Sequence, residues 1–379
     1  MKRFSIFAIS FLCFPLILPT TILADPLAFH ITDLGRGGAS GINDNGQVVG
    51  YFGSIPGPVV WSRSTGPVTL TKISGLNQFD AAGATDINNA GQIVGLARAS
   101  YNVGQTVAVL WTNPNSLTPL PNTHQDNSAT AINQSGLIVG NGNVSRYSGP
   151  VAWQNGVGFQ LPLLGYTLQT GPQGDALDVN DAGIIVGSSS IPTSRNRHAV
   201  YWENGTAHDL GTLSGDESSG ARAVSNNGAI VGESMGPSGS RAFLWTASEG
   251  MKLLGSLGGE STLPTAINDN GWVIGNSYGA SNFTPFLRLP GQNVADLNSF
   301  VDLTNSSFSS LTYAADMNSL GDIVGFGLAK DGSTHAFLIS PVPEVQTWLF
   351  LLVGLTFIWW RLSMLRQKDN RWSRSLGYV

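Results

Sequence analysis

The sequence is poor in cysteine, histidine and charge. Its single cysteine, Cys13, excludes a disulfide framework and any zinc site built from Cys-x-x-Cys pairs. Charged residues make up 11% of the chain, against about 25% in an ordinary soluble domain, which argues against a helix-rich cytosolic enzyme. The five histidines show neither an H-E-x-x-H string nor paired spacing, so we expect no metal site and no cofactor.

Glycine, in contrast, is abundant. It accounts for 47 of the 379 residues, about one in eight against an average of roughly 7%, and it follows no G-x-y triplet period, which excludes collagen and predicts many turns. Hydrophobic residues, at 42%, are sufficient for a sizeable core. The chain is therefore not a disordered one.

The N-terminal segment has the pattern of a secretory leader. Two basic residues precede an apolar run over residues 4–18, and a small residue, Ala24, ends the segment. A charged start, a short apolar core and a small residue at the cut are typical of a signal peptide. We therefore expect residues 1–24 to be removed by cleavage between Ala24 and Asp25. The alternative, a retained anchor, is disfavoured because the apolar run is short and interrupted by proline.

A second apolar segment lies near the C-terminus. Residues 345–360 carry no charge, and as a helix rising 1.5 Å per residue they would extend about 24 Å, enough to span a thin bilayer. Tryptophans stand at both ends of the segment, where interfacial aromatics belong, and basic residues are frequent in the tail 361–379. The sequence predicts one transmembrane helix over about 345–360, with the tail in the cytoplasm by the positive-inside rule.

The residues around this segment resemble a known sorting signal. Pro343, Glu344 and Val345 precede the apolar span, and Arg361 begins the basic terminus. This order resembles the PEP-CTERM signal, which an exosortase recognises and cleaves in envelope-bearing bacteria, although the family's tripeptide is Pro-Glu-Pro. For the tail 342–379 the resemblance implies an exosortase-like partner and a final location in the cell envelope or outside the cell. The alternative is a permanent single-span anchor.

Either alternative exports the region between leader and span. Residues 25–344 contain 12 Lys or Arg and 23 Asp or Glu, a net charge of −11. Nucleic-acid binding depends on neutralising phosphates with basic side chains. We therefore expect no nucleic-acid partner.

A repeat dominates the exported region. A Gly-x-[Ile/Val]-[Val/Ile]-Gly string occurs seven times at spacings of 43 to 50 residues, and each copy follows an Asn or Ser turn of the form N-x-x-G or S-x-x-G. The second glycines of the strings are Gly50, Gly95, Gly140, Gly187, Gly232, Gly275 and Gly325.

Each repeat predicts four short strands. The first ends at the N-x-x-G turn, where Asn and Gly tolerate a left-handed backbone, and the second is the glycine-flanked string. An apolar segment ending in an aromatic residue and a short fourth segment follow. Four strands of about five residues with their loops take up about 45 residues, which is typical of a propeller blade. We expect an all-β fold, a seven-bladed β-propeller over residues 25–341.

The ends of the repeat region favour a closed ring. Residues 29–35 have the pattern of a fourth strand without the other three, and residues 335–339 that of a third strand without a fourth. Pairing the two would complete the last blade and cover an exposed strand edge. The alternative, a linear solenoid, would need capped ends and gains nothing from this arrangement.

The third strands carry a second resemblance. The strings at 198–202, 241–245 and 334–338, with D-L-G-T-L at 209–213, resemble the HAF family of extracellular repeats, which is named for its His-Ala-Phe string. The first three repeats lack the histidine. The resemblance implies an exported repeat protein, often with a PEP-CTERM tail, and no established activity.

Catalytic motifs are weak in this context. Gly-x-Ser-x-Gly strings at 232–236 and 275–279 match the nucleophile elbow of hydrolases, but that motif needs a strand-to-helix turn, so we expect no enzyme. Asp86, Asp178 and Asp316 share one position on the predicted innermost strands. They would form a weak cation site or, more simply, a solvated polar lining.

The predicted binding face is the one where the repeats differ. Loops from second to third strands, and from each repeat to the next, emerge on the same face of a propeller. They carry Tyr and Arg, which are enriched in binding hot spots. The candidate residues are Tyr51, Phe52, Arg98, Tyr101, Arg146, Tyr147, Arg195, Arg197, Tyr278 and Phe283.

The expected function is a non-catalytic binding or structural module of the cell envelope or extracellular matrix. Its partner would be a polysaccharide or a protein. The alternative is a propeller-type polysaccharide lyase or glycosidase, for which Asp216, Glu217 and Glu260 could supply carboxylates on the same face. Adjacency in sequence does not establish the carboxylate separation that glycoside chemistry needs.

Overall fold

The computed structural model separates into residues 28–342 and the two chain ends. It describes residues 27–53, 57–71, 81–98, 106–121, 125–144, 147–166, 171, 173–237, 239–279, 283–342, 356, 358 and 359. Near the C-terminus, Thr356, Ile358 and Trp359 are helical. No helix within these ranges is long and apolar enough to cross a bilayer.

The predictions for the two ends fall mostly outside the described residues. These are the leader 1–24, most of the span 345–360 and the basic tail 361–379. The same holds for the individual cleavage and sorting residues, which are Ala24, Asp25, Pro343, Glu344, Val345 and Arg361.

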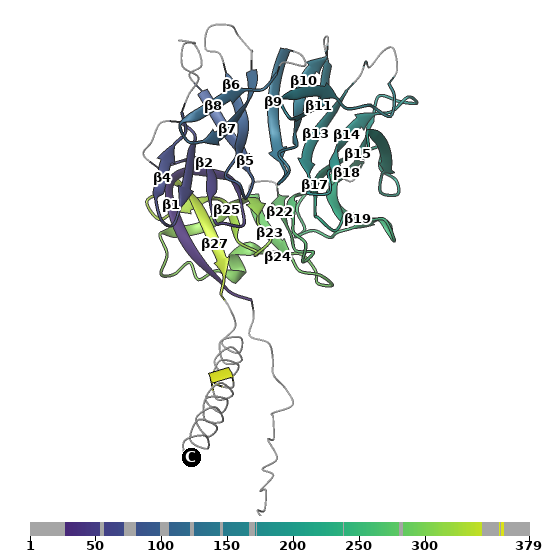
Figure 1. Ribbon diagram of the computed structural model, residues 1–379. Helices are drawn as coiled ribbons and strands as arrows, with labels where there is room; N and C mark the ends of the chain where they lie inside the picture. Colours follow the sequence, from purple (N-terminus) through teal and green to yellow (C-terminus); the bar gives the residue numbers. More distant parts are fainter. Residues whose placement is uncertain are drawn as a thin grey trace, which may run out of the picture. The chain divides into compact units, whose positions relative to one another are not determined.

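Residues 28–342 form antiparallel sheets of short strands, as the all-β prediction requires (Figure 1). Three sheets have four strands, hydrogen-bonded in chain order. Their strands are β5 (Ala81–Ile87), β6 (Ile93–Arg98), β7 (Thr106–Asn113) and β8 (Ser116–Pro119); β9 (Gln125–Ile132), β10 (Ile138–Val144), β11 (Tyr147–Gln154) and β12 (Val157–Gln160); and β13 (Gly174–Val179), β14 (Ile185–Ser190), β15 (Arg197–Glu203) and β16 (Thr206–Gly211).

Two larger sheets contain the remaining strands. In the eight-stranded sheet, one parallel bridge between Ser240 and Ser261 joins two antiparallel sets of four. These strands are β17 (Ser218–Val224), β18 (Ile230–Gly236), β19 (Gly239–Thr246), β20 (Gly250–Leu253), β21 (Ser261–Ile267), β22 (Val273–Tyr278), β23 (Phe283–Arg288) and β24 (Ala295–Asp296), after which comes a 3-10 turn, η1 (Leu297–Phe300). The seven-stranded sheet has the order β25 (Phe308–Met317), β26 (Ile323–Ala329), β27 (Thr334–Pro341), β1 (Phe29–Ile42), β2 (Val48–Phe52), β3 (Val59–Ser62) and β4 (Gly66–Thr69).

Strand β1 brings the beginning and the end of this unit together. Its first half, from Phe29 to Arg36, pairs with β27, and its second half, from Gly37 to Ile42, pairs with β2. Figure 1 shows β1 beside β27. The sequence predicts this pairing of the first strand with the last repeat. The sequence does not predict that this strand continues without a turn into the first repeat. In the structure β1 passes from one pairing to the other at Gly37, whose φ is +123°.

The first strand of every repeat contains a β-bulge that the sequence pattern does not predict. The pairing register with the second strand shifts three residues before the turn Asn or Ser. A bulge turns one side chain out of the strand's alternation and increases the local twist. The bulged residues are Ser40, Thr85, Thr130, Leu177, Arg222, Thr265 and Ala315.

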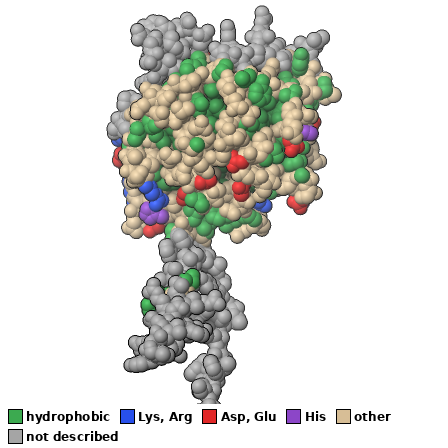
Figure 2. Space-filling view, in the orientation of Figure 1, with side chains coloured by type: hydrophobic (Ala, Val, Ile, Leu, Met, Phe, Trp, Pro, Cys, Tyr) green, Lys and Arg blue, Asp and Glu red, His purple; other side chains and the backbone are tan. Residues whose placement is uncertain are grey.

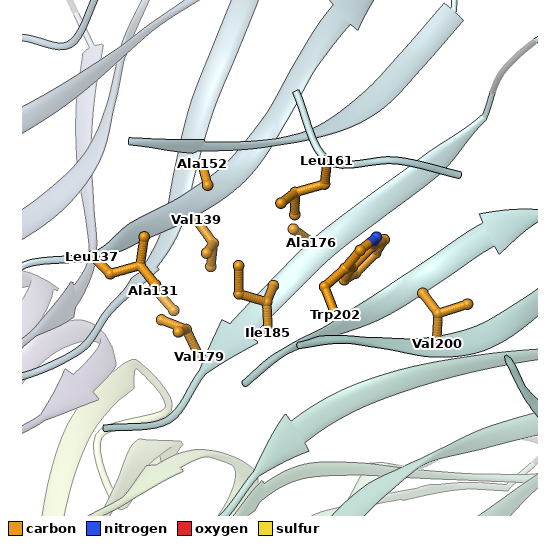
Figure 3. Close-up of a cluster of buried hydrophobic side chains, with 10 residues drawn as sticks. All are labelled: Ala131, Leu137, Val139, Ala152, Leu161, Ala176, Val179, Ile185, Val200 and Trp202. Atoms are coloured by element: carbon orange, nitrogen blue, oxygen red, sulfur yellow. The ribbon is translucent and has the colours of Figure 1, made fainter. Parts of the chain in front are cut away.

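The hydrophobic core lies between neighbouring sets of strands. In Figure 3, Ala131, Val139 and Leu161 from β9–β12 and the segment after them pack against side chains of the next sheet, among them Ile185 and Trp202. Similar clusters recur at other junctions, including the one between β1–β4 and strands β26 and β27. Each sheet is therefore stabilised by burying both faces against its neighbours.

Candidate functional site

Inner strands enclose a polar central cavity of about 290 Å³. Its lining comes from the ends of all seven first strands, β1, β5, β9, β13, β17, β21 and β25, and from the turns that follow them. Because every repeat contributes the same positions, the polar contacts around the cavity also repeat.

Turn asparagines link each repeat to the next around this cavity. The Nδ2 amide of one Asn donates to the backbone carbonyl oxygen of its counterpart in the following repeat. The bonds run from Asn43 to Asn88 (2.9 Å), Asn88 to Asn133 (3.1 Å), Asn133 to Asn180 (2.9 Å), Asn180 to Ser225 (3.0 Å), Asn268 to Asn318 (3.5 Å) and Asn318 back to Asn43 (3.1 Å). Ser225 has no carboxamide group. Among these described turns, the equivalent bond from Ser225 to Asn268 is therefore missing.

Three aspartates near the cavity form further links between repeats. The Oδ1 atom of Asp86 accepts from the N–H of Ile87 at 2.7 Å, and its Oδ2 accepts from Ile132 in the next repeat at 2.8 Å. Asp178 and Asp316 make equivalent pairs of bonds, to Val179 and Val224 and to Met317 and Ile42.

Burial opposes the ionisation of these carboxyls. It raises the pKa of Asp86 to about 7, with the nearby charge of Asp316 adding to the rise and the hydrogen bond from Ile132 opposing it. Burial also raises the pKa of Asp178 to about 6 and that of Asp316 above its ordinary value, again against two backbone hydrogen bonds.

The central cavity is thus primarily a junction between repeats. Its carboxyls and turn amides are engaged with the backbone of adjacent strands. Within the ranges that the structure describes, no three His, Cys, Asp or Glu side chains are grouped as a metal ion would need. A ligand site is better sought where polar groups face open space.

A second cavity, of about 310 Å³, meets this requirement. Residues of β13–β15, β17 and β18 line it, together with part of the loop that joins β14 to β15. Two predicted binding-face residues, Arg195 and Arg197, are in this lining. The others are Gln173, Asp175, Leu177, Ser188, Asn196, Ser218, Ser219, Gly220, Arg222, Glu233 and Met235.

Two ion pairs organise the charged wall of this second cavity. The Nη1 atom of Arg197 lies 2.5 Å from Oδ2 of Asp175, and that carboxylate also accepts from the hydroxyl of Ser188. Arg222 donates through Nε and Nη2 to Oε1 of Glu233, at 3.2 and 2.6 Å. Arg222 is the bulged residue of β17, and it lines both cavities. At the equivalent bulge position the other repeats have Ser, Thr, Leu or Ala.

One predicted binding-face residue is wrong. Phe52 is fully buried, in a core cluster with Leu34 and Val59. Strand β2 extends to this residue, and because side chains alternate along a strand, its neighbour Tyr51 faces outward instead, with 59% of its surface exposed. The strand therefore continues two residues beyond the end that the sequence predicts.

The other candidates lie apart from the second cavity or outside the described residues. Phe283 is exposed and makes an edge-to-face contact with Tyr278, their ring centres 4.7 Å apart, where β22 and β23 meet. Arg98 ends β6 and Tyr147 begins β11, so both lie in strands and not in loops. Tyr101 and Arg146 fall outside the described ranges.

The serines of the two hydrolase-like strings are in the interior of strands. Ser234 in β18 is fully buried and accepts from the N–H of Leu213 at 2.9 Å, and Ser277 in β22 is also buried. Neither stands at a strand-to-helix turn. The carboxylate of Asp216, one of the predicted acids, is held by Arg241 through contacts of 2.7 and 3.2 Å.

The HAF-type histidines have a structural partner that was not predicted. Nδ1 of His198 lies 3.0 Å from Asp209 on the neighbouring strand, and Nδ1 of His335 lies 3.0 Å from Asp33. The signal is present in the sequence, because D-L-G strings accompany the histidine strings. The second pair joins β27 to β1, so the strands that close the ring share a contact that His198 and Asp209 make within a single repeat.

Comparison with solved structures agrees with this arrangement. A streptogramin B lyase matches with a TM-score of 0.52 and 11% identity, covering 83% of this chain and 98% of that one. A virginiamycin B lyase from Staphylococcus aureus matches with a TM-score of 0.50 and 9% identity, covering 83% and 100%. Both are β-propellers. This chain has a β-propeller fold.

The propeller likeness concerns the fold alone, because one such fold serves many functions. No protein-family model matches the chain. No curated protein matches it either. The function must therefore be argued from the propeller's own side chains.

Proposed function

We propose that this protein is an exported, seven-bladed β-propeller that binds a polysaccharide or protein of the cell envelope or extracellular matrix without catalysing a reaction. A signal peptide directs its export. An exosortase-like enzyme sorts it through the C-terminal signal, and the C-terminal helix anchors it at least transiently in the membrane with its tail in the cytoplasm.

The strand pairings support a count of seven blades. Dividing β1 at Gly37 gives its first half to β25–β27 and its second half to β2–β4. Dividing the eight-stranded sheet at the single Ser240–Ser261 bridge gives two more sets of four. With the three four-stranded sheets, this assigns one blade to each sequence repeat.

The second cavity is the observation that carries the binding proposal. It lies at the β14–β15 loop, on the face that the sequence favours, and it brings Arg195 and Arg197 together with the Arg222–Glu233 pair. Clefts in which several polar groups converge are the usual ligand sites of proteins. The central cavity, in contrast, uses its polar groups to join repeats.

A glycan lyase or glycosidase is the second candidate, because two carboxylates, Asp175 and Glu233, line the same cavity. Each is bound to an arginine. A carboxylate whose oxygens are occupied by an arginine is poorly placed to exchange a proton with a substrate. We therefore favour binding over turnover.

A glycan array probed with the full chain in detergent separates these functions. Binding without product supports the proposal, whereas release of shortened or unsaturated sugars supports the enzyme. Absence of both, together with no protein captured from envelope fractions, would overturn it.

The sorting proposal needs its own measurement. Intact-mass analysis of the protein isolated from its native envelope is expected to show that residues 1–24 are missing and that the chain ends before the span. A retained span would instead support the permanent anchor, and a retained leader would overturn export through a signal peptide.

A further inference from the structure

Both ends of the propeller leave its sheets at one place. Strand β1 begins at Phe29 and strand β27 ends at Pro341, and these two residues are paired. Beyond them the N–H of Val342 donates to the carbonyl oxygen of Ala28 at 2.8 Å. Because β25, β26 and β27 are antiparallel neighbours, β27 ends on the same side as the turn at Asn318, which joins β25 to β26. The chain therefore continues from the face that carries the N-x-x-G turns, opposite the predicted binding loops.

An apolar edge surrounds this place, a name used here for Trp272, Leu320, Pro341 and Val342. A Cβ added at Gly321, the residue after Leu320, would lie 2.7 Å from Cζ3 of Trp272 and 3.3 Å from Cγ of Pro341. These side chains are therefore neighbours. Leu320 is 64% exposed and Val342 is 49% exposed. Apolar surface thus faces outward where the chain leaves the propeller.

Leu320 is unusual for its position in the repeat. It is the third residue of its turn, directly before the glycine, and its side chain is large and apolar. The corresponding residues of the other six turns are small or polar: Asn45, Ala90, Ser135, Ala182, Asn227 and Asn270. The turn itself does not need a leucine here. Together with the rest of the apolar edge, this leucine indicates a contact outside the propeller.

The sequence that follows indicates the partner. Only two residues separate Val342 from the uncharged segment 345–360, and three residue steps extend at most about 11 Å. When that segment spans a bilayer, the apolar edge must lie close to the lipid headgroups. Tryptophan is enriched at this depth because its ring is apolar and its N–H is polar. A lipid surface therefore suits the apolar edge.

The distribution of charge favours contact at this edge. Arg63 is exposed and donates from Nη2 to Oγ of Ser340 at 3.2 Å, and a guanidinium can also bind a lipid phosphate. Figure 2 shows basic and hydrophobic side chains at the lower end of the propeller, the end at which β1 begins and β27 ends in Figure 1. Three acids of the turns, Asp44, Asp181 and Asp269, line the central cavity instead. Anionic lipids would repel these acids, so the face should meet a membrane at its edge and not across the cavity.

We propose that the apolar edge docks on the lipid bilayer, with Trp272 and Leu320 at the level of the headgroups and Arg63 at the lipid phosphates. This inference rests on the proposed C-terminal anchor and adds a second contact with the same membrane. It orients the propeller, because the loop face with the second cavity then points away from the bilayer. The candidate binding site is thereby presented to partners in the surrounding matrix.

Quenching of a fluorescent label by spin-labelled lipids tests this contact. The full chain carries Cys13→Ser, so that an introduced thiol is the only one, and is reconstituted in vesicles of phosphatidylcholine and phosphatidylglycerol. A dye is attached at Leu320→Cys or, as the matched control, at Ala182→Cys, which has the same exposed turn position in the fourth repeat. Headgroup-labelled nitroxide lipids should quench the dye at position 320 about threefold more strongly than at position 182.

A second pair of variants tests the leucine itself. The dye is placed at Ser64→Cys, in the exposed turn next to Arg63. Adding Leu320→Asp should reduce its quenching to about half, because a carboxylate is costly in the bilayer interface. Adding Ala182→Asp should leave the quenching unchanged. Both aspartates lie in exposed turns, and both variants should keep the unfolding midpoint of the unaltered protein.

Flotation of the vesicles separates the docking from the anchor. A chain that floats with the vesicles but shows equally weak quenching at positions 320 and 182 would overturn the docking and leave the anchor in place. Equally strong quenching at both positions would show that the whole turn face lies on the bilayer and would overturn the apolar edge as the contact. A chain that does not float would overturn the anchor and the docking together.

Discussion

The side-chain amide of Asn318 donates to the backbone carbonyl oxygen of Asn43, 275 residues earlier, at 3.1 Å. The same bond joins Asn43 to Asn88 and other neighbouring repeats. Closure of the ring therefore uses a contact that also occurs within the chain. Because β1 pairs with β27 at the same junction, backbone and side-chain bonds reinforce each other there.

The Asn318 side chain is expected to stabilise both its own turn and the closure. Its Oδ1 accepts from the N–H groups of Leu320 and Asp322, and its Nδ2 reaches Asn43. Asn318→Ala should lower the free energy of unfolding by about 1–3 kcal/mol, since it leaves buried polar groups unpaired. Urea unfolding measures this loss.

Serine at the same position separates the two roles. Ser225 accepts from the N–H of Ala229, so Asn318→Ser should keep part of the hydrogen bonding within the turn and lose the link to Asn43 completely. Its cost should lie between zero and that of alanine. If both variants lower the free energy of unfolding equally, the link to Asn43, and not the turn, accounts for the lost stability. If neither lowers it, the side chain of Asn318 does not stabilise the closure.

The missing link of the ring can be added. Ser225→Asn would supply a carboxamide where the series of inter-repeat bonds is interrupted, next to the carbonyl oxygen of Asn268. One buried hydrogen bond contributes about 0.5–1.5 kcal/mol, and thermal unfolding should detect a gain of this size. Asn226→Ala, one residue further along the exposed turn, is the control and should not stabilise. A loss on Ser225→Asn would indicate that the cavity has no room for the amide.

Much of this arrangement follows from the sequence, but the contacts between repeats do not. The turn at Asn43 and the strand after it are predictable because N-x-x-G fixes the local backbone. That Asn43 also reaches Asn88 depends on the angle between blades, which no local pattern encodes. The bulge at Ser40 escapes prediction for the same reason, since its hydroxyl bonds to Ala84 in the next repeat.

The candidate site shows the same division between local and long-range information. The position of Arg195 and Arg197 in the segment after a second strand was predictable, because the glycine-flanked string marks where that strand lies. Their cavity was not, because it also needs Arg222 and Glu233 from the next blade. The prediction for Phe52 is wrong because strand β2 continues two residues beyond Gly50. The side chain of Phe52 therefore lies in a strand and packs in the core.

Stability is expected to fall as the pH rises towards neutrality. Burial raises the pKa of Asp86 to about 7 and that of Asp178 to about 6, from 3.8. A carboxyl whose pKa is higher in the folded state binds its proton more tightly there, so its contribution is present below about pH 4 and is lost as the pH rises through the folded pKa. A tenfold tighter hold on the proton in the folded state corresponds to about 1.4 kcal/mol of stability.

Unfolding midpoints at pH 5 and pH 8 test this expectation. The midpoint should be higher at pH 5, and Asp86→Asn, which cannot ionise, should reduce the difference while lowering stability at pH 5 through the loss of one backbone hydrogen bond. Asp302→Asn is a matched control, because Asp302 bonds to Thr304 in an exposed turn and burial has little influence on it. A midpoint that is higher at pH 8 in the unaltered protein would contradict the prediction.

Tryptophans of the third strands should differ widely in their contribution to stability. Trp202 is 1% exposed, packs in the cluster of Figure 3 and donates from Nε1 to the carbonyl oxygen of Pro162 at 2.6 Å. Trp202→Ala should cost about 3–5 kcal/mol through the cavity that it leaves. Trp202→Phe keeps most of the packing and should cost about 1–3 kcal/mol, because the carbonyl oxygen loses its donor. Trp245, at the equivalent position in β19, is only half-buried, so Trp245→Ala should cost clearly less than Trp202→Ala. Guanidinium unfolding measures the free energy of unfolding of all three variants. Equal losses of stability for Trp202→Ala and Trp245→Ala would contradict the prediction that burial determines the contribution of each tryptophan.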